Sequence, residues 1–210
     1  QKFGLGSLAV PGSGGLSVSV DETLQMRGSD FTIEAWASLS AYGNSLVFQS
    51  NVFSGAVDDT IQFRVIDATR VYWEVGTKSE LVDFVFGLNT FRHVAVTRDG
   101  NQARLFIDGA QVGTTLTNPG TLPTIDRFTI GDGVRSGSSS TPWNGYIDEF
   151  RVTKGQALYV APFTPPAGPF PNPGAVGSTA AGILAGQAHA IALGQQRAER
   201  QRLARGPVGI

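Results

Sequence analysis

The stretch RHVAVTRDGNQARLFIDGAQVG, residues 92–113, gives the clearest indication of the fold. Its side chains alternate through residues 93–98 and again through 102–107, with the period of two that places one face of a strand against a core. Asp99-Gly100-Asn101 separates the two runs, and Asp108-Gly109 follows the second. Gly and Asn tolerate the positive φ angles of tight hairpins. The stretch therefore predicts consecutive antiparallel strands.

The same alternation recurs from Gly14 to Phe150, where no helix-period stripe has a comparable length. Strands are predicted within the runs Leu16–Val20, Phe31–Ala37, Ile61–Val65, Val71–Val75, Phe128–Ile130 and Tyr146–Val152. Many short strands at this spacing are typical of two sheets that bury their inner faces against each other. The predicted fold class is all-β, a two-sheet antiparallel jelly-roll sandwich.

Composition excludes several functional classes. The 210 residues include 16 Lys and Arg against 17 Asp and Glu, a net charge of -1, so a basic nucleic-acid binder is excluded. There is no Cys, which removes disulfides and thiolate metal sites, and the 2 His cannot form a multi-His site. The chain begins at Gln1 without a signal segment, so we expect a processed chain or a piece of a longer one.

A second region begins where prolines become frequent. Proline cannot join a central ladder, so the repeated prolines between residues 162 and 173 predict a domain at 1–172 and a C-terminal tail at 173–210. The body contains 12 basic and 16 acidic residues, net -4, and the tail 4 basic and 1 acidic, net +3. Ser178 suits a helix start and Gly206-Pro207 a stop, so the Ala- and Gly-rich tail is predicted to be helical.

Several motifs in the body, read in order, resemble the laminin G-like family of concanavalin A-type jelly rolls. The likeness is greatest to the variety found in bacteriophage tail and other virion proteins. The motifs are Lys2-Phe3-Gly4, Phe31-Thr32-Ile33-Glu34-Ala35-Trp36, the stretch 92–109, Gly145-Tyr146-Ile147-Asp148-Glu149-Phe150-Arg151-Val152, Ala157-Leu158-Tyr159, Phe163-Thr164-Pro165-Pro166 and Pro169-Phe170-Pro171. The resemblance covers residues 1 to about 172. It implies a binding or structural module that is often directed at sugars.

Catalysis is disfavoured by the arrangement of carboxylates. Retaining glycosidases need two carboxyl groups about 5 Å apart, whereas Asp148 and Glu149 are adjacent and point to opposite faces of a regular strand. We expect this pair to bridge strands and loops, Glu34 to act as a cross-strand partner, and His93 to be structural. The chain is predicted to be non-enzymatic.

Calcium is a candidate cofactor, because the resemblance implies rim sites built from Asp side chains and loop carbonyls. These are the oxygen ligands that Ca²⁺ prefers. The candidate metal ligands are Asp58 and Asp59 in one loop and Asp132 in another, with Asn51 nearby in sequence. The alternative is that these carboxylates are simply solvated loop residues.

A glycan site needs an exposed aromatic ring with polar groups beside it. Trp143 with Asn144 is the first candidate and Tyr42 with Asn44 the second, whereas Trp36 and Trp73 are expected to be buried on strands. For Trp143 the alternative is packing at the start of the strand that follows it.

The tail is predicted to dock against a partner, because its small residues permit close approach of another backbone. The assembly residues are Ile183, Leu184, Ile191, Arg197 and Arg200. Gln187 and His189 disfavour a membrane span, and a disordered tail is the alternative.

Two functions follow from these features. The first is a non-enzymatic structural or binding protein of a phage-type virion, a tail or head-decoration component whose jelly roll faces outward, with sister subunits or other virion proteins as partners. The alternative is a carbohydrate-binding module of a larger bacterial surface or secreted protein, with cell-surface glycans as partners.

Overall fold

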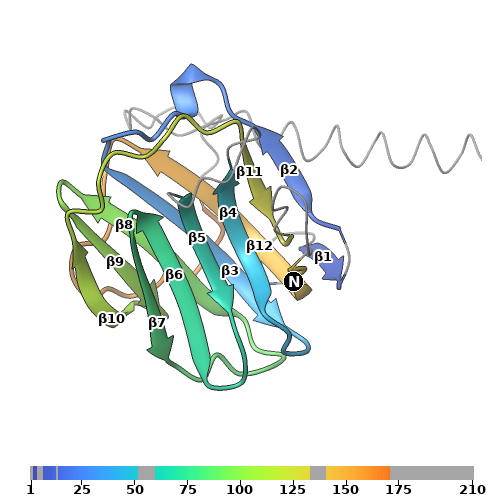
Figure 1. The fold of residues 1–210 in the computed structure, drawn as a ribbon. Coiled ribbons are helices and arrows are strands. Elements are labelled where there is room, and N and C mark those ends of the chain that lie inside the picture. The colour runs from blue at the N-terminus through green and yellow to red at the C-terminus, as the bar shows by residue number, and fades with distance from the viewer. Residues whose placement is uncertain (1, 4–6, 13, 52–59, 133–140, 171–210) are drawn as a thin grey trace, which may run out of the picture. The chain divides into compact units, whose positions relative to one another are not determined.

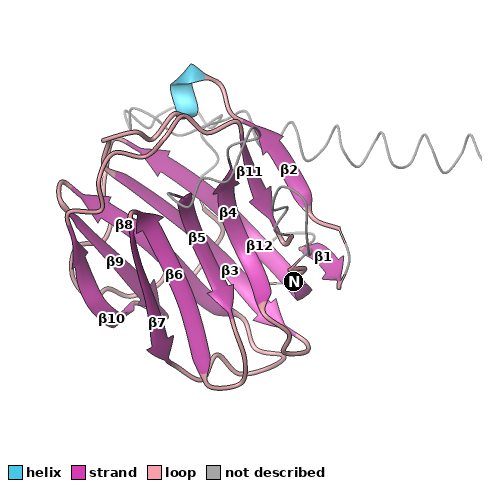
Figure 2. Ribbon diagram, viewed as in Figure 1, coloured by secondary structure: helices cyan, strands magenta, loops and turns pink. Residues whose placement is uncertain are grey.

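The computed structural model describes residues 2–3, 7–12, 14–51, 60–132 and 141–170. Within them, two antiparallel six-stranded sheets pack face to face, and the one helical element is a single turn, η1 (Glu22–Leu24). Figure 1 shows the two layers and Figure 2 the predominance of strands. The predicted all-β, two-sheet antiparallel sandwich is confirmed.

The two sheets have the following strands in spatial order. Sheet A contains β1 (Leu8–Pro11), β12 (Asn144–Lys154), β3 (Phe31–Leu39), β8 (Arg92–Asp99), β9 (Gln102–Ile107) and β10 (Ala110–Thr117). Sheet B contains β2 (Leu16–Ser19), β11 (Arg127–Ile130), β4 (Ser45–Asn51), β5 (Thr60–Val65), β6 (Arg70–Gly76) and β7 (Lys78–Asp83). Each strand run predicted from the alternation corresponds to one of these strands, with β2 ending one residue before Val20, and β1, β4 and β7 are additional.

The two predicted turns around β9 form tight hairpins. Asp99 pairs with Gln102, and Ile107 pairs with Ala110, so two residues close each hairpin. Gly100 and Gly109 have φ 56° and 81°, the positive values expected of glycine in these turns, and Asp108 also has a positive φ, 51°.

The core lies between the sheets and is rich in aromatic residues. On β5, Ile61, Phe63 and Val65 all point inward and are fully buried. Further aromatic side chains that are fully buried in the sandwich are Phe31, Phe48, Trp73, Phe86, Phe128 and Trp143. The expected burial of Trp36 and Trp73 is confirmed.

The described part of the chain belongs to one unit, Gln1–Phe170. The helix predicted for the tail and the assembly residues Ile183, Leu184, Ile191, Arg197 and Arg200 lie outside the described residues. Within the described ranges, no helix has the length and apolar character needed to cross a membrane.

Candidate functional site

The outer face of sheet A holds a buried charged cluster. Glu34 on β3 is fully buried, and its Oε2 lies 3.0 Å from Nε2 of His93 on β8 and accepts from the Tyr159 hydroxyl at 3.0 Å. Its Oε1 accepts from Nε of Arg151 at 2.8 Å, and Arg151 is its register partner on β12. The cross-strand role predicted for Glu34 and the structural role predicted for His93 are confirmed.

The electrostatics of this cluster keep Glu34 ionised. Burial raises the pKa of Glu34. The hydrogen bond to His93 and the Arg151 guanidinium together lower the pKa by more than burial raises it, so the pKa lies below its ordinary value of 4.5. Burial and the nearby Glu34 carboxylate raise the pKa of Tyr159, which therefore stays a hydrogen-bond donor. The Glu34 carboxylate is thus buried and fully engaged rather than exposed, whereas Nδ1 of His93 is buried with no hydrogen-bond partner among the described residues.

Residues 155–170, here called the C-terminal strap, cover this cluster. Tyr159 and Phe163 stack with centroids 3.5 Å apart and planes 5° apart, and both meet the His93 ring edge-on. Phe170 also meets the His93 ring edge-on, at 6.5 Å between centroids. The chain therefore fills the outer face of sheet A with its own aromatic side chains.

The adjacent carboxylates of β12 hold two distant parts of the chain. Asp148 Oδ2 accepts from three donors near the N-terminus, Lys2 N (2.9 Å), Phe3 N (3.2 Å) and Ser7 Oγ (2.9 Å). Glu149 Oε2 accepts from the backbone N–H of Phe170 at 2.6 Å, at a bulge where Glu149 has φ 50°. The predicted bridging role of this pair is confirmed, and both side chains are engaged in holding backbone.

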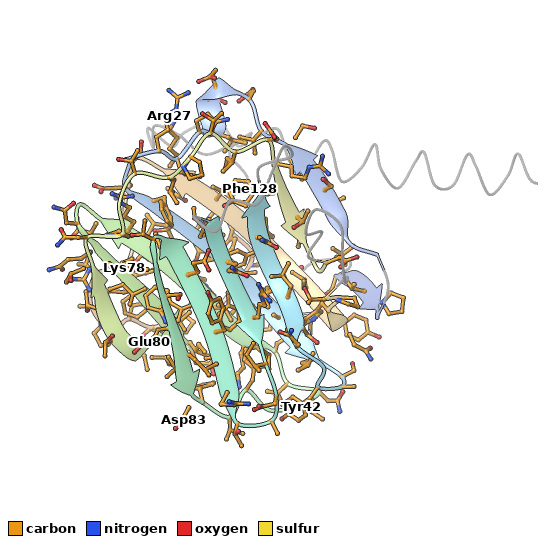
Figure 3. The ribbon with its side chains drawn as sticks, viewed as in Figure 1. Arg27, Tyr42, Lys78, Glu80, Asp83 and Phe128 are labelled. Atoms are coloured by element: carbon orange, nitrogen blue, oxygen red, sulfur yellow. The ribbon has the colours of Figure 1, made fainter. Side chains whose placement is uncertain are left out.

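Sheet B carries polar side chains on its outer face. The strand registers place two neighbouring rows there, because residues paired across strands point to the same side. The first row consists of Gln49, Gln62, Glu74 and Ser79. The second row consists of Arg64, Tyr72 and Leu81. In Figure 1 this sheet faces the viewer, and Figure 3 shows Lys78 and Asp83 at the two ends of β7, which borders the rows.

The β5–β7 part of these rows has a base and an accessible layer. Gln62 and Glu74 form the base and are buried, with Gln62 Nε2 donating to Glu74 Oε2 at 2.9 Å. Arg64 and Tyr72 lie beside them in the second row and are half-buried. Arg64 Nε donates to Gln62 Oε1 at 2.6 Å, and the Tyr72 hydroxyl donates to Glu74 Oε2 at 2.5 Å. The base therefore fixes the two side chains that reach the surface.

Tyr72 is held as a neutral phenol. Burial raises the pKa of Tyr72, and the hydrogen bond to the Glu74 carboxylate raises it further. The Arg64 guanidinium carbon lies 5.6 Å from the centre of the Tyr72 ring, within cation–π range. Together with the exposed Ser79 and Leu81, these residues combine a fixed aromatic ring, a guanidinium and a hydroxyl. We call Gln62, Arg64, Tyr72, Glu74, Ser79 and Leu81 the sheet B site.

The predicted exposure of Trp143 is wrong. Trp143 is 0% exposed, its Nε1–H donates to the Ser38 carbonyl at 3.1 Å, and its ring packs edge-on against Phe86. The alternative, packing at the start of β12, is what the structure shows. Burial of the indole removes a large apolar area from water, and its one donor, Nε1–H, is satisfied by the backbone carbonyl of Ser38 on β3.

The other predicted glycan residues lie at one end of the sandwich. Tyr42 is half-buried and Asn44 exposed in the turn between β3 and β4, and Asn144 is exposed at the start of β12. The Ser40 N–H donates to the Asn144 carbonyl at 2.7 Å, which joins the two segments. Figure 3 shows Tyr42 at the same end of the sandwich as Asp83. The structure thus brings three of the four residues to one rim, and their sugar-binding role stays a prediction.

Of the predicted calcium ligands, Asp132 has a side chain that the structure describes. Asp132, at the end of β11, is half-buried, whereas Asp58 and Asp59 and the side chain of Asn51 lie outside the described residues. Among the residues that the structure describes, no three His, Asp or Glu side chains gather into a metal-binding group. No chemistry of this chain is therefore derived through calcium.

The sequence contains part of the signal for the sheet B site. Gln62 and Arg64 alternate with Ile61, Phe63 and Val65, a pattern that predicts side chains pointing away from the core. Tyr72 and Glu74 alternate in the same way on the next run. What was missing was the register that places these two pairs side by side, since pairing partners cannot be read from one strand alone.

Comparison with known proteins places the chain in a superfamily. The Laminin_G_3 family model, described as the concanavalin A-like lectin/glucanases superfamily, matches residues 12–158. The chain belongs to this superfamily. A search of curated proteins finds no match.

Solved structures of similar fold come from several organisms. The sialidase carbohydrate-binding module CBM40 of Ruminococcus gnavus, bound to α2,3-sialyllactose, has a TM-score of 0.50 at 17% identity, with 70% of this chain and 92% of that chain covered. A heptameric pentraxin of Limulus polyphemus has a TM-score of 0.53 at 15% identity, covering 72% and 76%. Domains LG4-5 of the mouse laminin α1 chain have a TM-score of 0.52 at 17% identity, covering 79% and 47%. At these identities the likeness shows the fold alone.

Proposed function

We propose that this protein is a non-enzymatic glycan-binding module that binds sugar through the sheet B site. The observation that carries the proposal is the hydrogen-bonded group on one sheet face, in which the buried Gln62–Glu74 pair holds the half-buried Arg64 and Tyr72 beside it. Sugars are bound by flat apolar surfaces that contact ring carbons and by polar groups that bond hydroxyls. The accessible layer supplies both kinds of contact.

The contrast between the sheets supports this choice of face. The charged cluster of sheet A lies under the C-terminal strap, so a ligand would have to displace Tyr159 and Phe163 to reach it. Tyr72 and Arg64, in contrast, are half-buried and are bordered by the exposed Ser79 and Leu81. The fold adds further support, because the Ruminococcus gnavus module of similar fold binds a sialylated glycan.

A non-catalytic role fits the positions of the carboxylates. Glu34 is fully buried and shared among three partners, while Asp148 and Glu149 bind backbone N–H groups. Within the sheet B site, Glu74 is buried and accepts from Gln62 and Tyr72. Each of these carboxylates has a positioning role, and we assign none of them to bond cleavage.

The test begins with a glycan array probed with the full chain, followed by calorimetric titration of the best ligand. Arg64→Ala and Tyr72→Ala should each weaken binding at least about tenfold, because each removes a contact worth about 1.5 kcal/mol or more. The matched control is Arg104→Ala on β9 of sheet A, since Arg104 donates to Gln102 as Arg64 donates to Gln62. An array without a bound glycan, or unchanged binding by both site variants, would overturn the proposal.

The virion role is the finer form of this proposal. It holds that the body is displayed on a phage-type particle and that the tail, 173–210, docks it to the particle or to sister subunits. The opposite net charges of body and tail support it, -4 against +3 by the residue counts given above. Light scattering of the full chain and of a chain ending at Asn172 tests it: a tail-dependent oligomer supports docking to sister subunits. Two monomers would exclude that docking, and docking to a different virion protein would then stand level with a module of a surface or secreted protein.

The calcium site is a separate proposal at Asp58, Asp59 and Asp132. Its support is the oxygen chemistry of three loop carboxylates in a family with rim sites. Millimolar calcium should raise the melting temperature of the protein, and Asp132→Asn should reduce that rise. An unchanged melting temperature and unchanged glycan binding would exclude the site.

A further inference from the structure

Some buried polar atoms of sheet A have no protein partner. Among the residues that the structure describes, four buried side-chain atoms lack a hydrogen-bond partner: Trp36 Nε1, His93 Nδ1, Thr97 Oγ1 and Arg104 Nη1. Buried polar groups in native proteins are almost always bonded, because an unpaired one bears the full cost of leaving water. These four atoms therefore need an explanation.

All four atoms belong to side chains on the outer face of sheet A. Trp36 is two residues from Glu34 on β3, and Thr97 is four residues from His93 on β8, so each of these pairs points to one side of the sheet. Trp36 is the register partner of His93, and Thr97 is the register partner of Arg104. The atoms therefore form two couples, each on adjacent strands, where opposite Cβ atoms lie about 4.5–5.5 Å apart.

The first couple combines a donor with a nitrogen that has two possible roles. The Trp36 and His93 rings have centroids 5.3 Å apart, and an indole nitrogen only donates. His93 Nε2 lies 3.0 Å from the Glu34 carboxylate, so Nε2 carries a proton. Nδ1 then accepts when the imidazole is neutral and donates when it is protonated. Water both donates and accepts, so one water molecule suits the couple in either state.

The second couple has the same complementarity. The Thr97 hydroxyl donates and accepts, whereas the Arg104 guanidinium only donates. Arg104 Nη2 donates to the Gln102 side chain, which leaves Nη1 as the nitrogen without an acceptor. A water molecule that accepts from Nη1 can also bond to the threonine hydroxyl.

The C-terminal strap encloses both couples. The rings of Tyr159, Phe163 and Phe170 meet the His93 ring edge-on. Near the second couple, the Leu158 N–H of the strap donates at 2.8 Å to Oγ1 of Thr32, the register partner of Thr97. Both His93 and Thr97 are 0% exposed. Any molecule that bonds to these atoms is therefore held inside the folded chain.

We propose that two ordered water molecules are bound between sheet A and the C-terminal strap. One bridges Trp36 Nε1 and His93 Nδ1, and the other bridges Thr97 Oγ1 and Arg104 Nη1. Buried waters in proteins bond to two to four polar groups that would otherwise be unsatisfied, and each couple supplies two of them. The strap is thus seated on a hydrated sheet face, and this inference is independent of the proposed glycan-binding function.

The first site is tested by NMR on the ¹⁵N-labelled full chain, through rotating-frame Overhauser contacts between indole N–H protons and water. Trp73 and Trp143 are internal controls, because their indoles donate to protein acceptors, Glu80 and the Ser38 carbonyl. We expect a contact with water at the Trp36 indole and none at the two control indoles. No contact at Trp36, or equal contacts at all three indoles, would overturn the first site.

A nearby ammonium group requires its own control. Lys2 Nζ lies 4.0 Å from the centre of the Trp36 ring, and its protons exchange with solvent, so they could relay the signal. Lys2→Met removes those protons. The contact with water at Trp36 should persist in this variant, and its disappearance would overturn the first site.

The second site is tested by Thr97→Val, which removes the hydroxyl and keeps the shape of the side chain. Loss of a hydrogen bond to bound water should lower the melting temperature by about 2–4 °C. Thr32→Val is the matched reference, because Thr32 is also 0% exposed but bonds to Leu158 N and to the Gln156 carbonyl, and it should lower the melting temperature at least as much. A melting temperature of Thr97→Val that is unchanged or raised would show an unpaired hydroxyl and overturn the second site.

Discussion

The two sheets carry similar polar chemistry on their outer faces but use it in opposite ways. On sheet A, Glu34 is bound by Arg151 and lies beneath Tyr159 of the C-terminal strap. On sheet B, Glu74 is bound by Gln62 and by Tyr72, which is itself half-buried at the surface. Both faces thus have a buried carboxylate that accepts from a tyrosine hydroxyl. The difference is whether that tyrosine comes from a neighbouring strand or from a segment that crosses the sheet.

On sheet A, the C-terminal strap lies over the polar side chains, which therefore contribute to stability rather than to ligand binding. A buried charge is tolerated only when it is paired and hydrogen-bonded. Glu34 meets that condition with partners from two strands and the strap. Removal of any one partner leaves the buried carboxylate with fewer hydrogen bonds. In the sheet B site, Gln62, Glu74, Arg64 and Tyr72 are bonded to one another within a single sheet. Stability should therefore depend on sheet A, and ligand binding on sheet B.

The largest effect is expected from Glu34→Ala. Removing the carboxylate leaves the Arg151 guanidinium beside a buried site, and breaking a buried pair costs about 3–5 kcal/mol. The matched control is Glu22→Ala, which breaks the Arg27–Glu22 pair with side chains 53% and 78% exposed and should cost under about 1 kcal/mol. Urea unfolding measures both. Equal losses would mean that the sheet A cluster contributes no more than an exposed pair.

A smaller effect is expected from Gly109→Ala, which tests how closely the strap is seated. Gly109 has φ +81°, and a Cβ there would lie 1.9 Å from the Phe163 carbonyl oxygen. Gly100, in the preceding hairpin, has φ +56° with nothing within 4 Å of such a Cβ. Gly109→Ala should cost more than about 2 kcal/mol, and Gly100→Ala about 1 kcal/mol, from strain alone.

Thermal unfolding and limited proteolysis distinguish these two glycine variants. The Gly109 variant should also become susceptible to cleavage within residues 155–170, since its strap must shift. If both variants melt alike and resist protease alike, the strap is not held against the β9–β10 turn.

The next prediction compares one tyrosine on each sheet, and the expected change in the free energy of unfolding is smaller. Tyr159→Phe removes the hydroxyl that donates to Glu34 but keeps the ring that stacks on Phe163, and it should cost about 1–2 kcal/mol. Tyr72→Phe removes the equivalent bond to Glu74. Tyr159→Phe should lower stability without changing glycan affinity, and Tyr72→Phe should lower glycan affinity with a smaller loss of stability. The reverse pattern would exchange the roles of the two sheets.

The sequence predicts the fold well where alternation is regular. The β8–β9–β10 hairpins follow from alternation together with glycine and asparagine at the turns, both of which are local properties. Strands β4 and β7 are harder to predict. Val47 lies at a register shift within β4, and β7 has Glu80 inward and Leu81 outward, so its pattern opposes the usual one. In both strands, pairing and edge contacts outweigh the local pattern.

The candidate site is less predictable because it depends on register and on burial. Trp143 precedes a strand and follows a serine-rich stretch, which suggests exposure, yet an acceptor on Ser38 and a neighbouring Phe86 place it in the interior. Tyr72 and Arg64 are eight residues apart and become neighbours only through the β5–β6 pairing. A single sequence gives the outward direction of each side chain but not its partners across the sheet.

The smallest expected effect is on the pH dependence of stability. The pKa of Glu34 lies below 4.5 because His93 and Arg151 outweigh the effect of burial, so the folded protein binds the Glu34 proton less readily than the unfolded chain does. The resulting stabilisation is fully present above about pH 4.5 and is lost as the pH falls through the folded pKa. Glu34→Gln, which does not titrate, should therefore be less stable than the unmodified protein near neutral pH. The gap should narrow as the pH falls toward about 3.

Urea unfolding at several pH values checks this, and Glu74→Gln provides the comparison with sheet B. Because acid also affects the rest of the protein, the informative quantity is the difference in the free energy of unfolding between each variant and the unmodified protein at each pH. If the gap for Glu34→Gln stays constant with pH, Glu34 is not held as a carboxylate by His93 and Arg151. In that case the sheet A face owes its stability to the aromatic side chains of the strap and not to the charge beneath them.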